Sequence, residues 1–118
     1  MELTINGKET EIVFGIAFNR ELDMKYKVEG FGLKFGAGLD TVIPELLSDN
    51  VGTLADVIYN GTAHIKKGRP SGMQVDKFVE EHEDIEELFD LVKTELEKAN
   101  ATKKKVALWK KDLNLEKE

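Results

Sequence analysis

The sequence predicts an α+β protein that is mainly α, in which an N-terminal two-stranded β-hairpin packs on a bundle of about five helices. Two observations support this fold class. An Asn6-Gly7 pair stands between two short alternating segments, and apolar residues recur every three or four positions through most of the later sequence. We expect a single domain over residues 1–118, divided into a hairpin (2–13), a helical body (15–100) and a lysine-rich C-terminal helix or tail (101–118).

The composition excludes several classes of protein. The 118 residues are 41% hydrophobic and 34% charged, which is typical of a folded, soluble domain. The formal net charge of −6 argues against binding nucleic acid over the whole surface. There is no cysteine, so disulfides, thiolate catalysis and cysteine-ligated zinc are excluded. The lack of cysteine also fits a reducing cytoplasm. The N-terminal segment lacks the features of a signal peptide, and no segment has the ~20 apolar residues that cross a membrane.

The hairpin signal lies at the N-terminus. Leu3 and Ile5 alternate with polar residues, and a returning strand follows the Asn6-Gly7 pair. Asn-Gly suits a two-residue type I′ turn because both central residues have positive φ. A lone two-stranded hairpin is marginal in water, so its apolar face should pack on helices.

A glycine-rich segment, GFGLKFGAG, follows the first predicted helix, which carries Phe18, Leu22 and Tyr26 on one face. The four glycines of the segment are Gly30, Gly32, Gly36 and Gly38. A dinucleotide-binding loop needs Gly-x-Gly-x-x-Gly, and Phe35 stands where the third glycine belongs. We therefore interpret the segment as a packed connection that positions the next helix, and we expect no nucleotide.

The next helix has an apolar face formed by Leu39, Val42, Ile43, Leu46 and Leu47. Pro44 interrupts this pattern. It is tolerated if the helix begins near Asp40 or Thr41, because the first N–H groups of a helix have no partner within it.

A further helix is predicted from Thr53, an N-cap type of residue, with Asp56 three residues on. Its apolar face consists of Leu54, Val57, Ile58 and Ile65. Gly61 falls inside this pattern and lowers the helix propensity, so it indicates a close approach of two helices.

The segment from Gly68 to Gly72, GRPSG, is the plainest break in the chain, and we interpret it as a loop within one fold. Two more helices are predicted by two apolar sets: Val75, Phe78 and Val79, then Ile85, Leu88, Phe89, Val92 and Leu96. Asp84 and Glu87 suit the start of the second of these helices. Acidic residues dominate positions 76–97, which is typical of a solvated helix face.

The charge reverses near the C-terminus, where Lys103–Lys105 and two later lysines surround Val106, Trp109 and Leu113 on one helix face. Three interpretations stay open. The helix folds onto the protein's own core, with its lysines offsetting the acidic helix before it. It docks on another protein with Trp109 as the anchor. Its lysines contact phosphates while the indole stacks on a base. If a protein partner binds here, we predict that Val106, Trp109 and Leu113 form the site.

No catalytic, cofactor-binding or metal-binding site is predicted. The serines (Ser48 and Ser71) and the histidines (His64 and His82) show no spacing that indicates a nucleophilic site. His82 and Glu86 stand four residues apart, but a zinc site requires three or four ligands. We therefore predict that the protein is not an enzyme and needs no cofactor.

The order of segments is a hairpin (MELTINGKETEIVFG), a helix (FNRELDMKY), GLKFGAGLDTVIPELL, TLADVIYNGTAHIK, the GRPS loop and EDIEELFDLVKTELEKANATKK. From Met1 to about Lys105 this order resembles that of the tail assembly chaperones of long-tailed, siphovirus-type phages and prophages of Gram-positive bacteria. The parts that carry the resemblance are Leu33-Lys34-Phe35-Gly36 with Gly38-Leu39, then Pro44 and Leu46, and Arg69-Pro70-Ser71. Gly61 departs from the pattern, since a small helix former such as alanine is expected there.

The resemblance implies a non-enzymatic factor that binds the tape measure protein, a long, helix-rich and aggregation-prone chain. It keeps that protein soluble and helps tail tube subunits assemble around it. The resemblance also implies action in the host bacterial cytoplasm and absence from the mature virion. The partners would be the tape measure protein and the tail tube protein, with neither nucleic acid nor membrane, and self-association stays open. Two alternatives remain: a small nucleic-acid-binding regulator that uses the lysine-rich C-terminus, and a structural subunit of a larger particle.

Overall fold

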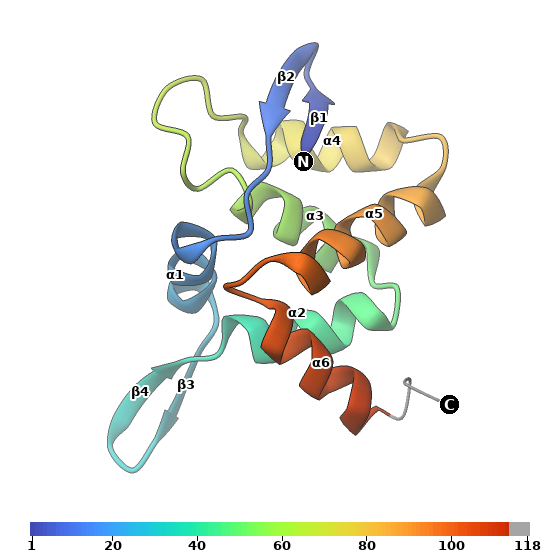
Figure 1. Cartoon of the computed structure of the whole chain (residues 1–118). Coiled ribbons are helices and arrows are strands. Elements are labelled where there is room, and N and C mark those ends of the chain that lie inside the picture. Colours follow the sequence, from blue (N-terminus) through green and yellow to red (C-terminus); the bar gives the residue numbers. More distant parts are fainter. Residues whose placement is uncertain (114–118) are drawn as a thin grey trace.

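The computed structural model describes residues 1–113, which form six helices and two β-hairpins (Figure 1). The strands are β1 (Glu2–Ile5), β2 (Lys8–Glu11), β3 (Lys27–Gly30) and β4 (Leu33–Gly36). The helices are α1 (Ile16–Lys25), α2 (Gly38–Leu47), α3 (Val51–Asn60), α4 (Gly72–Glu81), α5 (Ile85–Lys98) and α6 (Lys103–Asp112). The predicted α+β, mainly α, fold class is confirmed. The described residues form six helices, whereas about five were predicted. The last five residues of the predicted tail lie outside the described residues.

The N-terminal hairpin is confirmed. β1 and β2 pair antiparallel, and Asn6 and Gly7 form the turn with φ of 54° and 72°, as a type I′ turn requires. Leu3 and Ile5 are buried, and β1 lies against α4. The hairpin therefore packs its apolar face on the helices, as its marginal stability alone demands.

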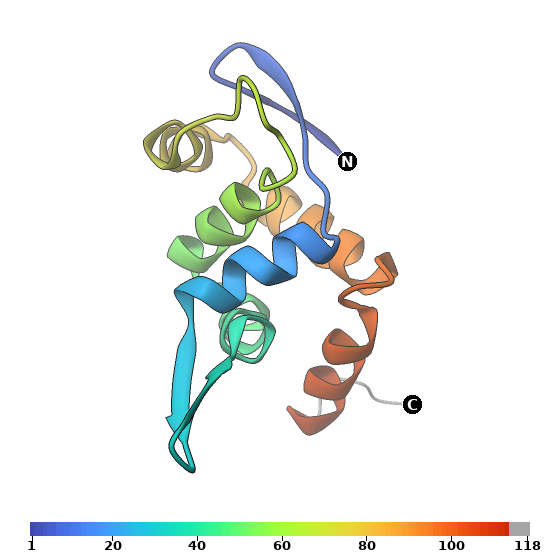
Figure 2. The same ribbon diagram turned by 90° about the vertical axis from the view of Figure 1, so that its left-hand side faces the viewer.

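The helices and the first hairpin share one hydrophobic core. α3 and α5 cross the middle of the molecule, α4 and the first hairpin lie on one side of them, and α2 and α6 lie on the other (Figure 1). α1 lies across α2 and α3 (Figure 2). The largest fully buried side chains are Ile5, Ile12, Phe18, Leu22, Val42, Ile43, Leu46, Leu54, Val57, Ile58, Leu88 and Leu96. Among the described residues, no helix is long and apolar enough to cross a membrane.

The predicted start of α5 is confirmed, and α4 has a cap that was not predicted. The Asp84 side chain accepts a hydrogen bond of 3.0 Å from the Glu87 N–H and caps α5. Before α4, the loop ends at Ser71, one residue earlier than predicted, and the Ser71 hydroxyl accepts from the Gln74 N–H. The Gln74 side chain accepts in turn from the Ser71 N–H, which completes a capping box.

The predicted cap of α3 is wrong. The N-cap is Asn50, whose side-chain oxygen accepts a 3.0 Å hydrogen bond from the Thr53 N–H. Asparagine is at least as good an N-cap as threonine, and it stands three residues earlier. Thr53 lies in the first turn, where its hydroxyl donates to Glu45 Oε1 at 2.6 Å and joins α3 to α2.

The close approach of two helices predicted at Gly61 is also wrong, because Gly61 approaches an extended segment. α3 ends at Asn60, so Gly61 caps the helix and Ile65 lies beyond it. Gly61 lies against the extended segment after the first hairpin, not against a helix. A Cβ at this position would lie 2.5 Å from Ile12 Cγ2 and 3.1 Å from the Phe14 ring. Only glycine lets that segment pass so close to the end of α3.

α2 begins at Gly38 and not near Asp40 or Thr41, so Pro44 lies inside the helix. The early start has a tertiary cause: the Gly38 N–H donates to Asp23 Oδ1 of α1 at 2.9 Å, which satisfies one of the first-turn donors. Because proline has no N–H, the Asp40 carbonyl lacks its usual partner four residues later.

The glycine-rich segment forms a second hairpin that was not predicted. β3 and β4 pair antiparallel around a turn at Phe31 and Gly32, with φ of 54° and 75°. The hairpin extends away from the helices beyond the end of α1 (Figure 2). The interpretation as a packed connection is therefore wrong for the tip. It is right for the base, where Gly36 and Gly38 lie against α1.

Candidate partner-binding surfaces

α6 carries the three residues predicted to bind a partner, and the structure separates them. Val106 is only 4% exposed and belongs to the core, whereas Trp109 is partly buried against it. Leu113, which follows the last turn, is 41% exposed. The three side chains therefore do not share one exposed surface. Leu108, which the predicted stripe leaves out, is an exposed apolar residue of α6.

Polar contacts hold α6 to the helical body. Lys105 Nζ donates to both carboxylate oxygens of Asp40 at 2.9 Å, and Trp109 Nε1 donates to one of them at 3.0 Å. The hydrogen bond from Lys105 and then that from Trp109 hold the pKa of Asp40 below its ordinary value. Lys110 pairs with Glu97 of α5. α6 thus folds onto the protein's own core, with lysines that offset carboxylates of α2 and α5.

The second hairpin gathers exposed apolar side chains. In its register Val28 is opposite Phe35 and Gly30 is opposite Leu33, so these residues share one face. Val28 is 53% exposed, Leu33 is 60% exposed and Phe35 is 46% exposed, and Phe31 at the tip is fully exposed. We call Val28, Phe31, Leu33 and Phe35 the hairpin surface. Clustered exposed apolar side chains are typical of interaction sites.

Phe31 occupies a strained position. Its φ of 54° lies in the left-handed region, which costs a bulky L-residue about 1–2 kcal/mol. Asn6 has the same φ in the first hairpin, but asparagine tolerates it. Because Phe31 is fully exposed, no packing within residues 1–113 offsets the cost. Strain of this kind is typical of residues that serve binding.

The base of the second hairpin is held tightly against α1. A Cβ at Gly36 would lie 2.5 Å from Asp23, and one at Gly38 would lie 2.5 Å from Leu22 Cβ. The chain can therefore rejoin the helical body so close to α1 only because both positions are glycine. This close packing fixes where the hairpin emerges, although its tip packs on nothing within residues 1–113.

The end of α1, just before β3, is fixed as well. The Tyr26 hydroxyl donates to Asp56 Oδ2 of α3 at 3.0 Å, and Lys25 Nζ lies 3.0 Å from the same oxygen. Burial and then the hydrogen bond to Asp56 raise the pKa of Tyr26. The Tyr26 carbonyl accepts from the Ala37 N–H at 2.7 Å, which closes the base of the hairpin.

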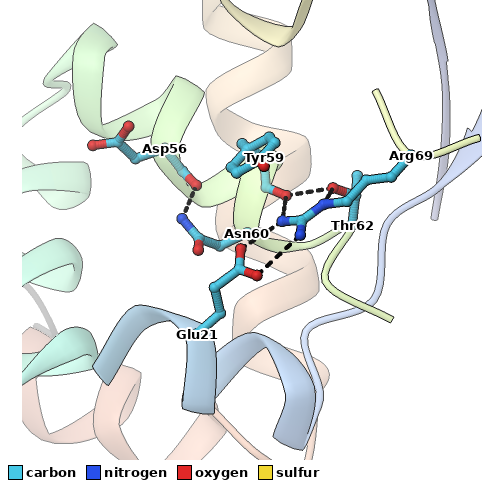
Figure 3. Close-up of polar contacts among 6 residues, drawn as sticks. All are labelled: Glu21, Asp56, Tyr59, Asn60, Thr62 and Arg69. Carbon is cyan, nitrogen blue, oxygen red and sulfur yellow. Dashed lines mark hydrogen bonds and ion pairs between the residues drawn. The ribbon is translucent and has the colours of Figure 1, made fainter. Parts of the chain in front are cut away.

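Arg69 lies at the centre of a polar network that joins the loop after α3 to α1 and α3 (Figure 3). Its guanidinium donates to both carboxylate oxygens of Glu21 and, through Nε, to the Thr62 hydroxyl at 2.8 Å. It also donates to the Tyr59 carbonyl at 3.2 Å and lies 4.2 Å from the centre of the Tyr59 ring. The Arg69-Pro70-Ser71 segment therefore has a structural role in fixing this loop.

The serines and histidines take local structural positions. Ser48 donates to a backbone carbonyl of its own helix, and Ser71 caps α4. His64 lies 3.6 Å from a carboxylate oxygen of Glu11. His82 follows α4 whereas Glu86 lies in α5, so the two do not share one helix face. In the described part of the chain, no three histidine or carboxylate side chains are grouped so as to hold a metal ion.

A hollow of about 690 Å³ lies between the tip of the first hairpin and the connection from α4 to α5. Its lining includes four acidic residues, Glu81, Glu83, Asp84 and Glu87. All four are exposed, so they lack the burial that separates an acid from a base. The hollow is a charged depression of the surface.

Comparison with protein families gives a match over nearly the whole chain. The model of a family described as "Phage tail assembly chaperone protein, TAC" matches residues 2–110. No curated protein matches, and no solved structure matches. The matched residues include both hairpins and most of α6.

Proposed function

The chain belongs to the family of phage tail assembly chaperones, and we propose that it binds the tape measure protein, keeps it soluble and helps tail tube subunits assemble around it. The role of the family in tail assembly is that of a chaperone and not of an enzyme. We propose further that the protein acts in the host bacterial cytoplasm, is absent from the mature virion and serves a siphovirus-type phage or prophage of a Gram-positive bacterium.

The observation that carries this proposal is the hairpin surface. A chaperone for an aggregation-prone chain needs exposed apolar surface, bordered by charge, that covers an apolar segment of its partner. The hairpin surface offers four apolar side chains on a base fixed by Gly36 and Gly38. Lys27, Glu29 and Lys34 lie on the opposite face and keep the free hairpin soluble.

An apolar helix of the partner suits this surface. Leu33 and Phe35 stand two residues apart on one strand, which separates them by about 7 Å. Side chains on one face of a helix repeat about every 5–6 Å along its axis, so a helix laid along β4 can place apolar side chains against both residues. Phe31 at the tip extends the contact.

Co-production with the tape measure protein tests the proposal. We expect Phe31→Asn with Leu33→Thr to lower the yield of soluble tape measure protein by about tenfold, the effect of losing an apolar anchor. Asn-Gly is the preferred type I′ turn and threonine suits a strand, so the variant keeps the hairpin. Met73→Gln removes an exposed apolar side chain of α4 and serves as the matched control. An unchanged yield from the double variant would show that the hairpin surface does not bind this partner.

α6 stays a proposed second contact, through Trp109 and Leu113 with the exposed Leu108. Trp109→Ala tests it by pull-down of the tape measure protein. Because Trp109 also bonds Asp40, Leu113→Ser is the second variant, since it leaves that contact intact. Unchanged binding by both variants, with unchanged folding, would remove α6 from the binding surface.

The two alternative functions have direct tests. A nucleic-acid-binding regulator would show DNA binding that weakens steeply with salt. The engagement of Lys105 by Asp40 and of Lys110 by Glu97 leaves that function less well supported. A structural subunit would be found in purified particles, from which a chaperone is absent.

A further inference from the structure

We propose that two copies of this chain pair through β3 and form a four-stranded antiparallel sheet, in the order β4–β3–β3–β4, about a two-fold axis at Val28. This inference goes beyond the chaperone function and does not depend on the tape measure protein. It rests on the free edge of β3, on the direction of the backbone groups there and on the charges beside them.

The edge of β3 is free to pair. In a hairpin with a two-residue turn, the residues that flank the turn exchange hydrogen bonds, and every second pair does so. Gly30 and Val28 therefore bond to β4, whereas Lys27 and Glu29 direct their N–H and C=O groups outward. Within residues 1–113, no backbone hydrogen bond joins these outward groups to another element. A two-stranded sheet is marginal, and further strands would stabilise it.

The backbone and the charges select one register. A pairing centred on Val28 places Lys27 of each copy opposite Glu29 of the other, so outward groups meet outward groups and opposite charges meet. A pairing centred on Lys27 or on Glu29 also joins outward groups, but it sets two like charges directly opposite each other, which is unfavourable. A register with its axis between two residues would place Lys27 or Glu29 opposite Val28 or Gly30. The backbone groups of Val28 and Gly30 are already bonded to β4, so no hydrogen bonds could form.

Lys27 has no charged residue opposite it in its own hairpin, so it is available to pair with Glu29 of a second copy. Its neighbour across the strands is Gly36, whereas Glu29 lies opposite Lys34 with 3.8 Å between their charged atoms. In the paired sheet each Glu29 would lie between Lys34 of its own chain and Lys27 of the second copy. The lysine that otherwise protects an edge from pairing is thereby neutralised.

The edge of β4 is less suitable. α1 packs against β4, and Asp23 lies directly over Gly36. Pairing through β4 would have to bring a second chain against this covered end of the strand. Pairing through β3 meets no such cover within residues 1–113. It also joins the two apolar faces, so that Val28, Leu33 and Phe35 of both copies form one continuous surface.

The test is the self-association of the full chain, measured by sedimentation velocity over a range of concentrations. We expect a concentration-dependent dimer. Lys27→Glu places a carboxylate opposite the Glu29 carboxylate of the second copy, and Glu29→Lys places an ammonium group opposite that of Lys27. Each single variant should therefore dimerise about tenfold more weakly than the parent chain. Both side chains are exposed, so neither change disturbs the core.

An equal mixture of the two variants is the decisive sample. One variant then offers two acidic residues and the other two basic residues at the axis, so the mixture should regain the affinity that each variant alone has lost. Lys66→Glu, which makes the same change of charge at an exposed loop position, should associate like the parent. A parent chain that stays monomeric, single variants that associate normally, or a mixture that does not recover would each overturn the proposal.

Discussion

The two hairpins of this protein have the same local structure and opposite surroundings. Each has two antiparallel four-residue strands and a two-residue turn with both φ values positive. The first buries Leu3 and Ile5 against helices, whereas the second leaves Leu33 and Phe35 exposed. Backbone structure alone therefore does not assign an apolar strand to the core. The deciding factor is whether the rest of the chain packs against it.

Connectivity explains the difference. The first hairpin continues into a segment that crosses the end of α3 at Gly61, which holds the hairpin over the core. The second hairpin is inserted between α1 and α2, and these helices already meet through Gly38 and Asp23. The helical body therefore closes without the second hairpin, which is left free to contact another molecule.

Truncating one apolar residue in each hairpin should give the largest difference in the free energy of unfolding between the two hairpins. Ile5→Ala removes a fully buried side chain, and we expect it to lower the free energy of unfolding by about 2–4 kcal/mol. Leu33→Ala, at an exposed position, should change it by less than about 0.5 kcal/mol. Urea unfolding measures both values. A comparable loss from Leu33→Ala would mean that the second hairpin packs on the body in solution.

The base of the second hairpin should behave like the core and unlike the tip. Gly38→Ala places a Cβ 2.5 Å from Leu22 Cβ, and we expect a loss of about 1–3 kcal/mol as α1 and α2 move apart. The matched control is Gly72→Ala at the start of α4, where a Cβ meets nothing within 4 Å. Thermal unfolding of the two variants gives the comparison, and equal midpoints would argue against a tight junction.

Exchanging the turn residues should change the stability of the two hairpins in opposite directions. Asn6→Phe places a strained residue in the first hairpin, and Phe31→Asn removes the strain from the second. We expect the first change to cost about 1 kcal/mol, because it makes the turn of a packed hairpin unfavourable. The second should slow amide exchange within β3 and β4 by up to about fivefold with little effect on global unfolding. Faster exchange in Phe31→Asn would show that the phenylalanine supports the hairpin.

We expect the smallest change in stability from the contact between Asp40 and α6, a helix that packs on the core. The pKa of Asp40 is lowered in the folded protein, so its contribution to stability is complete above about pH 4 and is lost as the pH falls through the folded value. Asp40 is half-exposed, so Asp40→Asn should cost only about 0.5 kcal/mol at neutral pH. Unfolding midpoints of parent and variant should converge in acid. A difference that does not depend on pH would mean that the carboxylate charge does not hold α6.

The sequence predicted the first hairpin and missed the second for a definite reason. Asn6-Gly7 is a preferred type I′ turn, but Phe31-Gly32 is not, and two further glycines in the strands obscure the alternation. The helical stripes were predictable because burial repeats with the period of the helix. The end of α3 and the start of α2 were not, since they depend on tertiary contacts at Gly61 and Gly38.

The candidate site shows the same limit. An apolar stripe such as that of Val106, Trp109 and Leu113 has one pattern whether it packs on its own chain or on a partner. Only the structure shows that Val106 is buried. The signal in the sequence that could have identified the hairpin surface was an aromatic residue directly before a glycine, Phe31-Gly32, between two segments that each carry an apolar residue.

Amide hydrogen exchange with and without the tape measure protein tests most directly whether the second hairpin serves to contact a partner. In the chain alone, residues 27–36 should exchange faster than residues 2–11, because only the first hairpin is packed. Added tape measure protein should slow exchange in residues 27–36 and leave residues 2–11 unchanged. Binding that protects other residues, with no change in residues 27–36, would contradict a role of the second hairpin in contacting this partner.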